Sequence, residues 1–221
     1  VILLNGRITN KSFKRWSLIK NFSKSVFKNI SLALPSNSET KNFLKKLGVR
    51  KIKLIGNLKY YGSSKVKNKD KKFLKNKFKN FKVWCAASTH EGEEIIISKL
   101  HKNIKRKQKK LLTIIIPRHI NRVEKIIAQI NVDKLKVIKH SSKTDIKKNT
   151  DIYIVDTYGE ASKFYNLSNI CFMGGSIINH GGQNPLEPAR LGNYIINGPN
   201  IRNFREIYKF LSKNSMSVTT S

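Results

Sequence analysis

The sequence is poor in acidic residues and in cysteine, and it has no long apolar run. Among 221 residues there are 13 Asp and Glu against 45 Lys and Arg, and only two cysteines. Cys85 and Cys171 both lie in apolar segments, so we expect reduced thiols and no disulfide framework. No run of eighteen apolar residues occurs, which argues against a membrane-spanning helix within this sequence.

Two common kinds of catalytic site are missing as well. The His, Cys and carboxylate residues show no metal-ligand spacing, and no serine stands in a glycine-flanked elbow. Internal repeats are also absent. We therefore expect no bound metal and no cofactor, and a chain of this length forms one large or two modest domains.

The formal net charge of +32 raises the possibility of nucleic-acid binding. Lysine greatly outnumbers arginine, however, and the basic residues are spread along the chain, at residues 65–79, 102–110 and 134–148 among others. We interpret them as a solvated basic surface that attracts anionic lipid headgroups or phosphorylated substrates, with no nucleic acid as partner. A basic RNA-binding protein remains the alternative that charge alone favours.

Strands and helices alternate in the first part of the chain, which is typical of a parallel-sheet α/β domain. Strands are expected at residues 1–5, 31–34 and 51–58, and helices at residues 11–27 and 38–47. Ser38 is expected to cap the second helix and Gly48 to end it. The lysine-rich residues 62–80 are predicted to be a linker.

A second alternating series follows the linker. Its expected strands are residues 82–87, 111–116, 135–139, 151–155, 170–173 and 193–197, and its helices residues 91–104, 121–130, 161–166, 185–191 and 204–211. We therefore predict two Rossmann-like units rather than one continuous sheet. In such sheets ligands bind beyond the carboxyl ends of the strands.

The most informative segment is residues 172–188, FMGGSIINHGGQNPLEP, which follows an expected strand. Its glycines permit positive φ and close approach of a ligand, Asn184 can cap a helix, and Pro185 suits its first turn. The free amides of that turn can point at an anion, and the Glu187 carboxylate can accept hydrogen bonds from ribose hydroxyls. The alternative is a glycine-rich turn with no ligand.

Three further polar motifs follow expected strands. Ser88 and Thr89 can cap a helix or hold phosphate oxygens, and Glu91 or Glu94 can complete a capping box with them. Pro117 stiffens the turn from which Arg118 offers its planar fork to a carboxylate or phosphate.

His119 can act as a general base, although lone histidines are usually structural. In the third motif, residues 156–160, Gly159 permits backbone approach to a ligand, and an Asp cap followed by a turn is the alternative. Four such motifs at strand ends of the same half indicate one binding site.

In this order the motifs resemble the Kdo (3-deoxy-D-manno-octulosonic acid) transferases of lipopolysaccharide synthesis. The matching pieces are NGRIT at residues 5–9, GNLKY at 56–60, AASTHEGEE at 86–94, PRH at 117–119, DTYGE at 156–160 and GGSIINHGGQNPLEPARLG at 174–192. The resemblance covers nearly the whole chain, and STHEGEE and GGxNPLEPA are specific to the family.

This resemblance implies an α/β GT-B glycosyltransferase fold, with two Rossmann-like domains facing each other across a cleft. It implies inverting transfer of Kdo from CMP-Kdo to a lipid A precursor, at the cytoplasmic face of the bacterial inner membrane. Residues 1–62 would then be the C-terminal part of the acceptor domain, and residues 63–221 the donor domain.

The resemblance also assigns the CMP site. It carries over to Pro117, Arg118, Tyr158, Gly159, Glu160, Asn184, Pro185, Leu186 and Glu187, with Ser88, Thr89, Gly175 and Ser176 as weaker candidates. On this basis Glu187 takes ribose hydroxyls and Arg118 faces the donor phosphate or carboxylate. The amides around Gly159 and Glu160 border the nucleotide.

Three positions depart from the family pattern: Tyr158 replaces a usual methionine, Gln183 a usual histidine and Gly6 a usual alanine. The family's catalytic glutamate is expected upstream of Val1, together with most of the acceptor pocket and the membrane anchor. We therefore expect no catalytic residue in this chain, weak donor binding and no transfer by the chain alone. The enzyme alternative is another GT-B transferase or an epimerase that uses a UDP-sugar.

Overall fold

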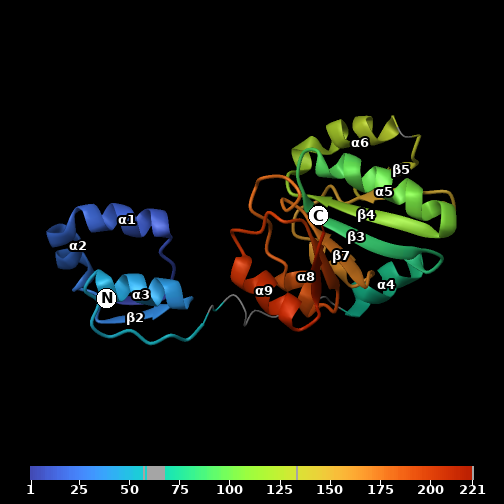
Figure 1. Ribbon diagram of the computed structural model, residues 1–221. Coiled ribbons are helices and arrows are strands. Elements are labelled where there is room, and N and C mark those ends of the chain that lie inside the picture. Colours follow the sequence, from blue (N-terminus) through green and yellow to red (C-terminus); the bar gives the residue numbers. More distant parts are fainter. Residues whose placement is uncertain (57, 59–67, 133, 221) are drawn as a thin grey trace. The chain divides into compact units, whose positions relative to one another are not determined.

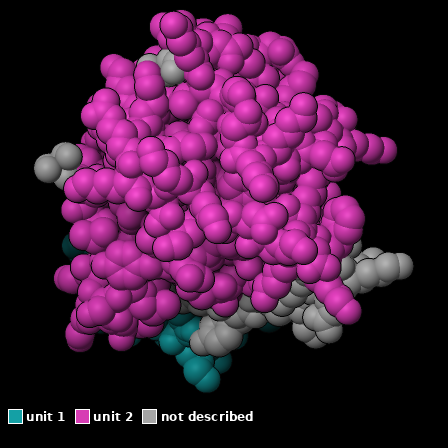
Figure 2. All heavy atoms as spheres, turned by 90° about the vertical axis from the view of Figure 1, so that its right-hand side faces the viewer, with its two compact units in different colours: residues 1–63 teal, residues 64–221 magenta. Residues whose placement is uncertain are grey.

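The structure is a computed structural model that describes residues 1–56, 58, 68–132 and 134–220. Two compact units, Val1–Ser63 and Ser64–Ser221, divide the chain (Figures 1 and 2). Each unit has its own apolar core.

The first unit is built on two parallel strands, β1 (Ile2–Gly6) and β2 (Leu32–Pro35). Three helices accompany them: α1 (Asn10–Leu18), α2 (Lys20–Phe27) and α3 (Ser38–Lys46). Their shared core consists of Phe27, Ala33, Leu44, Leu47 and Val49. Gly48 follows α3 at φ +101°, in the left-handed conformation expected of a glycine after a helix.

The expectation of one helix over residues 11–27 is wrong. Ile19 leaves the helical conformation, with φ −113° and ψ 55°, and separates α1 from α2. The break lets the Trp16 ring meet the Phe27 ring edge-on at 5.2 Å. In one straight helix these residues would lie about 16 Å apart along the axis, so the bend is what brings both into the small core.

Two smaller expectations also fail in this unit. Asn37, and not Ser38, caps α3, because its side-chain oxygen accepts the Thr40 N–H at 2.8 Å. Within the described part of residues 51–58, which leaves out residue 57, only Ile52 pairs, in a single bridge to Ala33. The ladder stops there because β2 ends at Pro35, which has no N–H to donate to a longer strand.

The expected linker at residues 62–80 is mostly helical where the structure describes it. Its helix is α4 (Asn68–Phe78), and residues 62–67 lie outside the described residues. Leu74 and Phe78, one turn apart, are buried in the core of the second unit. Two apolar side chains on one face are enough to dock the helix, despite the lysines around them.

The second unit contains a seven-stranded, entirely parallel sheet in the order β5-β6-β4-β3-β7-β8-β9. The strands are β3 (Lys82–Thr89), β4 (Leu111–Pro117), β5 (Val137–Lys139), β6 (Ile152–Ile154), β7 (Ile170–Met173), β8 (Tyr194–Asn197) and β9 (Ser217–Thr219). Every residue of the interior strand β4 is buried. The strand β9 lies outside every strand expected from the sequence.

Helices cover both faces of this sheet (Figure 1). They are α5 (Glu93–Lys107), α6 (Val123–Asn131), α7 (Ala161–Tyr165), α8 (Leu186–Arg190) and α9 (Arg205–Lys213), with a short 3₁₀ turn at Ile120–Arg122. The core beneath α5 and α6 and the core beneath α4, α7, α8 and α9 are separate apolar clusters. The predicted α/β class is therefore confirmed, with buried strands between two helical layers.

Both cysteines lie in this sheet, paired across β3 and β7 in register. Cys85 and Cys171 are fully buried free thiols. Burial raises the pKa of Cys85 to about 12, so this thiol stays protonated and unreactive at neutral pH.

Candidate functional site

The four polar motifs all follow the carboxyl ends of parallel strands, so they lie along one edge of the sheet. They follow β3, β4, β6 and β7, whose order in the sheet is β6-β4-β3-β7. Adjacent strands lie about 4.8 Å apart, so the loops after β6 and β7 are separated by about 14 Å along this edge.

The loops after β3 and β7 meet in very close backbone contact. The Gly174 N–H donates to the Ala87 carbonyl at 2.8 Å. A Cβ atom on Gly174 would lie 2.3 Å from the Ser88 carbonyl oxygen and 2.6 Å from the Thr89 Cα. A glycine is therefore required at position 174 for β3 and β7 to stay paired up to their carboxyl ends.

A buried carboxylate, Glu93, holds these two loops together. Glu93 is the first residue of α5 and is fully buried. It accepts the N–H groups of His90 at 3.0 Å, Gly175 at 2.7 Å, Ser176 at 3.1 Å and Ile177 at 3.1 Å. The four donors match the four acceptor sites of one carboxylate, and they fix the loop after β7 onto the start of α5.

The contacts of Glu93 indicate a structural role for the weaker candidates Gly175 and Ser176. Their amides already donate to Glu93. The buried Ser176 hydroxyl accepts the Gly198 N–H at 2.9 Å and donates to the Met173 carbonyl. Both residues thus organise the loop itself.

Of the other two weaker candidates, Thr89 is likewise engaged at the start of α5. The buried Thr89 hydroxyl donates to Glu94 Oε1 at 2.9 Å, and Arg122 donates to both Glu94 oxygens at 3.1 and 3.3 Å. Ser88 is partly exposed and has φ 53°, the left-handed region that non-glycine residues rarely adopt.

The helix start differs from a capping box. The N-cap position of α5 is Gly92, which has φ 93° and no side chain to donate or accept. Glu91 points away to Lys125, with which it forms an exposed ion pair. The part of a capping box that does form is the bond from the His90 N–H to Glu93.

Three histidines meet at the ends of β3, β4 and β7. The ring of His90 lies 4.1 Å from that of His180 and 5.9 Å from that of His119, measured between centroids. The side-chain amide of Gln183 donates to His90 Nε2 at 3.0 Å. The Tyr208 hydroxyl donates to the backbone carbonyl of Gln183 at 2.9 Å. Burial, followed by the charges of neighbouring histidines, lowers the pKa of His90.

Arg118 emerges from the end of β4 next to these histidines. Its N–H donates to the Thr89 carbonyl at 3.0 Å, and the preceding Pro117 is buried and paired with Thr89 in register. The Arg118 side chain is exposed. The geometry of the turn thus supports the predicted role of Pro117 in fixing the turn from which the guanidinium projects.

The loop after β6 is held by its own glutamate. Glu160 accepts hydrogen bonds from Lys163 at 2.7 Å and Thr157 at 2.5 Å, and it lies 3.0 Å from His140 Nε2. The Lys163 and Thr157 hydrogen bonds, together with the charge of His140, lower the pKa of Glu160 to about 2, against the opposing effect of burial. The Glu160 side chain thus serves its own loop, whereas Tyr158 is 73% exposed.

Gly159, at the tip of that loop, is exposed and has φ 76°. No heavy atom lies within 4 Å of the position where its Cβ would stand, so its backbone is open on that side. This loop therefore presents backbone to solvent, as a nucleotide-bordering turn requires.

The loop after β7 ends in the short helix α8. The helix begins one residue later than expected, with the buried Pro185 and not Asn184 at the N-cap position. Asn184 Oδ1 accepts the Leu186 N–H at 3.1 Å and so closes the turn that leads into the helix. Glu187 reaches solvent, yet desolvation by nearby protein atoms raises its pKa, with Arg190 acting in the opposite direction. The Glu187 charge also contributes to the raised pKa of the buried Tyr165.

The structure groups part of the predicted site and adds residues to it. The loops after β3, β4 and β7 are in direct contact, whereas no hydrogen bond joins Arg118, Gly159 and Glu187 to one another among the residues described. Sequence reasoning did not assign roles to Glu93, His90, His180 or Gln183. The available signal was the three glutamates of the STHEGEE motif, since a carboxylate at a helix start can accept backbone N–H groups such as those of the GGS motif.

A cavity of about 390 Å³ lies at the opposite edge of the sheet, where β3 and β4 begin. Asn80, Phe81, Lys110 and Lys148 line it. None of the strand-end motifs contributes to this cavity, so it is separate from the candidate site.

Within the described ranges, no three His, Cys, Asp or Glu side chains gather closely enough to bind a metal ion. Likewise, none of the helices in those ranges combines the length and apolarity needed to cross a membrane.

The known proteins that this chain resembles share one description. A family model described as 3-deoxy-D-manno-octulosonic-acid transferase (kdotransferase) matches residues 1–61. The 3-deoxy-D-manno-octulosonic acid transferase of Haemophilus influenzae is 33% identical over 216 residues, covering 95% of this chain and 50% of the relative. That of Rickettsia prowazekii is 32% identical, covering 99% and 47%. The chain thus spans about half the length of the curated relatives it matches.

Among solved structures, the chain resembles the C-terminal CMP-Kdo binding domain of WaaA from Acinetobacter baumannii. The TM-score is 0.66 at 29% identity, covering 69% of this chain and 81% of that domain. The N-terminal domain of Candida albicans trehalose-6-phosphate phosphatase matches with a TM-score of 0.50 at 10% identity, covering 98% of this chain and 53% of that one, a likeness of fold alone. The predicted α/β fold of the GT-B type is confirmed.

Proposed function

Because the chain belongs to the family of Kdo transferases, we propose that it carries the donor site for transfer of Kdo from CMP-Kdo to a lipid A precursor, with inversion at the anomeric carbon. The observation that carries this proposal is the likeness to a CMP-Kdo binding domain, together with four polar loops along one sheet edge.

The proposal divides the chain by role. Residues 1–62 form the C-terminal part of the acceptor domain, and residues 63–221 bind the donor. The polar strand-end motifs all belong to the second part, which supports this division. No acceptor-activating base is assigned within this chain.

The proposed donor contacts follow from what each loop offers. Glu187 accepts hydrogen bonds from the ribose hydroxyls, because it is a solvent-facing carboxylate at the start of α8. Arg118, exposed at the end of β4, binds the donor phosphate or carboxylate. The open backbone at Gly159 and Glu160 borders the nucleotide, with Tyr158 contributing mainly its backbone.

Pro117 and the turn of Asn184, Pro185 and Leu186 hold Arg118 and Glu187 in place for this role. The Thr89 hydroxyl and the backbone N–H groups of Gly175 and Ser176 support the same loops through their hydrogen bonds to Glu94 and Glu93 of α5. Ser88 precedes Thr89 at the end of β3.

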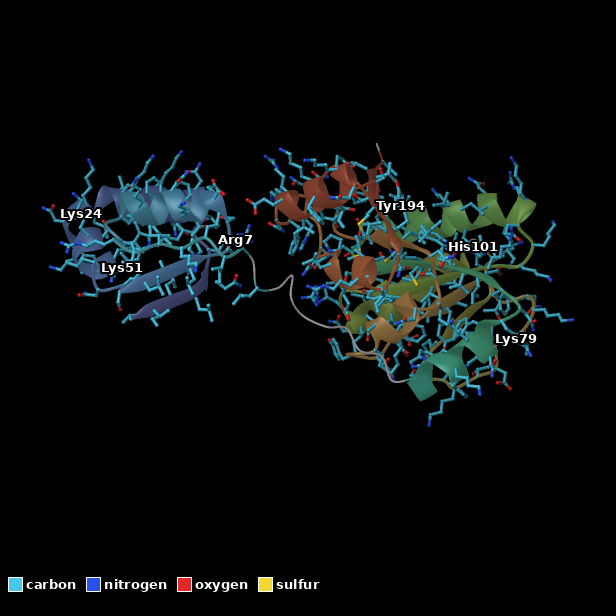
Figure 3. All side chains as sticks on the ribbon, turned by 90° about the horizontal axis from the view of Figure 1, so that it is seen from below. Arg7, Lys24, Lys51, Lys79, His101 and Tyr194 are labelled. Carbon is cyan, nitrogen blue, oxygen red and sulfur yellow. The ribbon has the colours of Figure 1, made fainter. Side chains whose placement is uncertain are left out.

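We place the protein at the cytoplasmic face of the bacterial inner membrane. Its net charge of +32 favours an anionic lipid surface, and basic side chains project from both units (Figure 3).

A thermal-shift comparison of CMP with UDP tests the donor assignment. A ligand that binds only the folded state raises its stability, by about 2.7 kcal/mol at one hundred times Kd. We expect protection by CMP and weaker protection by UDP. The Arg118→Ala/Glu187→Ala double variant should lose the CMP effect, while Arg106→Ala/Glu206→Ala, which removes exposed residues of the same types, should keep it.

Preferential protection by UDP would favour a UDP-sugar enzyme instead. RNA affinity that falls steeply with salt and survives the Arg118→Ala/Glu187→Ala change would favour the RNA-binding alternative.

A further inference from the structure

The histidine cluster, defined as His90, His119 and His180, brings together three loops that otherwise serve separate strands. Its rings come from the ends of β3, β4 and the segment between β7 and α8, with centroid separations of 4.1 Å and 5.9 Å from His90. Gly175 lies against two of them: its Cβ position is 3.2 Å from His180 Nδ1 and 3.2 Å from His90 Cδ2. The cluster is therefore packed against the Gly175 backbone at the carboxyl edge of the sheet.

His90 is the buried centre of the cluster, and His119 and His180 are its exposed members. The Gln183 amide donates to His90 Nε2, so the neutral His90 ring carries its proton on Nδ1. Among the described residues, no hydrogen-bond partner reaches a ring nitrogen of His119 or His180. Two exposed imidazoles thus stand beside a ring whose orientation is fixed.

The charges around the cluster are predominantly positive. The charges of His180, His119 and Arg122 lower the pKa of His90, whereas the charge of Glu93 raises it. Glu93 is occupied by four backbone N–H groups, and Glu94 by Thr89 and Arg122. Arg118, which is exposed, directly precedes His119 in the sequence. Glu91, which follows His90, is paired with Lys125. Each of these three carboxylates thus already has partners among the described residues, whereas the exposed rings of His119 and His180 remain open to a ligand.

We propose that this histidine cluster is the subsite for an oxyanion of the donor, either its phosphoryl group or the carboxylate of the transferred sugar. His119 and His180 donate to the anion, and His90 positions their rings. This inference rests on the proposed function and assigns residues that the CMP contacts described above do not include.

The proposal carries a definite pH dependence. Burial and the charges of His180, His119 and Arg122 lower the pKa of His90 in the free protein, with Glu93 acting in the opposite direction, and an anion bound beside the cluster would raise it. Donor affinity should therefore be strongest at low pH and fall as pH rises, by at most about tenfold per pH unit for each proton taken up.

The test compares three probes on the full chain by isothermal titration calorimetry. Cytidine has no anion, CMP has a phosphate, and CMP-N-acetylneuraminate has a phosphodiester beside a sugar carboxylate. The last probe is used for the pH series, because both of its anions remain charged between pH 6 and 8, whereas the second proton of a phosphate monoester titrates near 6.

His180→Asn should weaken binding of CMP-N-acetylneuraminate about tenfold at pH 6.5 and leave cytidine binding unchanged. An equal loss for CMP identifies the phosphoryl group as the ligand; a loss confined to the sugar acid identifies the carboxylate. His180→Lys should restore affinity and weaken its pH dependence. Lys213→Gln, which removes one positive charge at the opposite sheet edge, should bind as the unchanged protein does.

Unchanged affinity in both His180→Asn and His119→Asn would overturn the inference, as would an equal loss for cytidine. If the protein binds cytidine and CMP while these variants behave normally, the proposed function stands and only the subsite fails. If the protein binds none of the three probes, both proposals fail.

Discussion

At the level of single residues, Glu93 explains why a buried acid can sit in this fold without a cationic partner. Its two oxygens accept four backbone N–H groups, and it occupies the first turn of α5, where the helix dipole favours negative charge. The carboxylate thus takes the place that an anionic ligand often has at such loops. The loop after β7 gains a fixed shape from this arrangement.

Glu93→Gln should destabilise the protein by about 3 kcal/mol, because an amide offers one oxygen and turns its NH₂ group toward backbone donors. Urea unfolding followed by circular dichroism measures the change. Glu91→Gln, which removes one partner of an exposed ion pair two residues away, should leave the urea midpoint of unfolding unchanged. Equal midpoints for the two variants would show that the four hydrogen bonds contribute little.

The loops that carry the candidate site were predictable, but their mutual contacts were not. Asn184 and Pro185 carry local signals for a capped turn, which the structure contains. The Glu93 bond to Gly175 joins residues 82 positions apart. Spacing along the sequence holds no signal for such a contact, because it depends on which strands become neighbours.

Glu160 gives a second residue-level prediction, this time for pH. Its pKa is lowered from 4.5 to about 2, first through the hydrogen bond from Lys163. The stabilisation is therefore complete above pH 4.5 and is lost as pH falls toward 2. The stability gap between the unchanged protein and Glu160→Gln should narrow over this range in urea unfolding at pH 5.5, 4 and 2.5.

The matched control for this series is Glu206→Gln, an exposed glutamate of α9. Its unfolding free energy should follow that of the unchanged protein at every pH. A gap for Glu160→Gln that stays constant from pH 5.5 to 2.5 would contradict the prediction.

At the level of elements, buried strands were easier to predict than helix boundaries. The run Leu111–Pro117 is apolar at nearly every position and forms the fully buried β4. By contrast, β9 (Ser217–Thr219) has three residues, two of them exposed, and shows no comparable pattern. The break at Ile19 follows from tertiary packing of Trp16 on Phe27, which helical periodicity does not report.

The pairing of β3 with β7 should be sensitive to one atom at Gly174. Gly174→Ala places a Cβ 2.3 Å from the Ser88 carbonyl oxygen, and backbone on both sides has to shift. We expect a loss of about 2–3 kcal/mol in unfolding free energy. Gly192→Ala, at φ 88° with no atom within 4 Å, should cost only the strain of about 1 kcal/mol. A loss no larger than that of Gly192→Ala would contradict the close-contact explanation.

At the level of the whole molecule, charge and site geometry answer different questions. A net charge of +32 attracts lipid headgroups, nucleotides and nucleic acids alike, and salt weakens all of these attractions. Selection among them requires fixed donors and acceptors, which the described residues concentrate at the carboxyl edge of the second unit's sheet. The basic composition therefore could not identify the ligand, whereas the order of motifs along the strands could suggest it.

The division into two units predicts that residues 64–221 fold alone and bind CMP as the full chain does. This segment contains the whole seven-stranded sheet, both of its apolar cores and all of the proposed donor contacts. Its Kd for CMP by calorimetry should agree with that of residues 1–221 within about twofold, the usual tolerance for independent parts. Arg118→Ala/Glu187→Ala should weaken binding equally in both lengths. A Kd more than ten times higher in the shorter chain, with cooperative unfolding retained, would mean that the first unit contributes to the donor site.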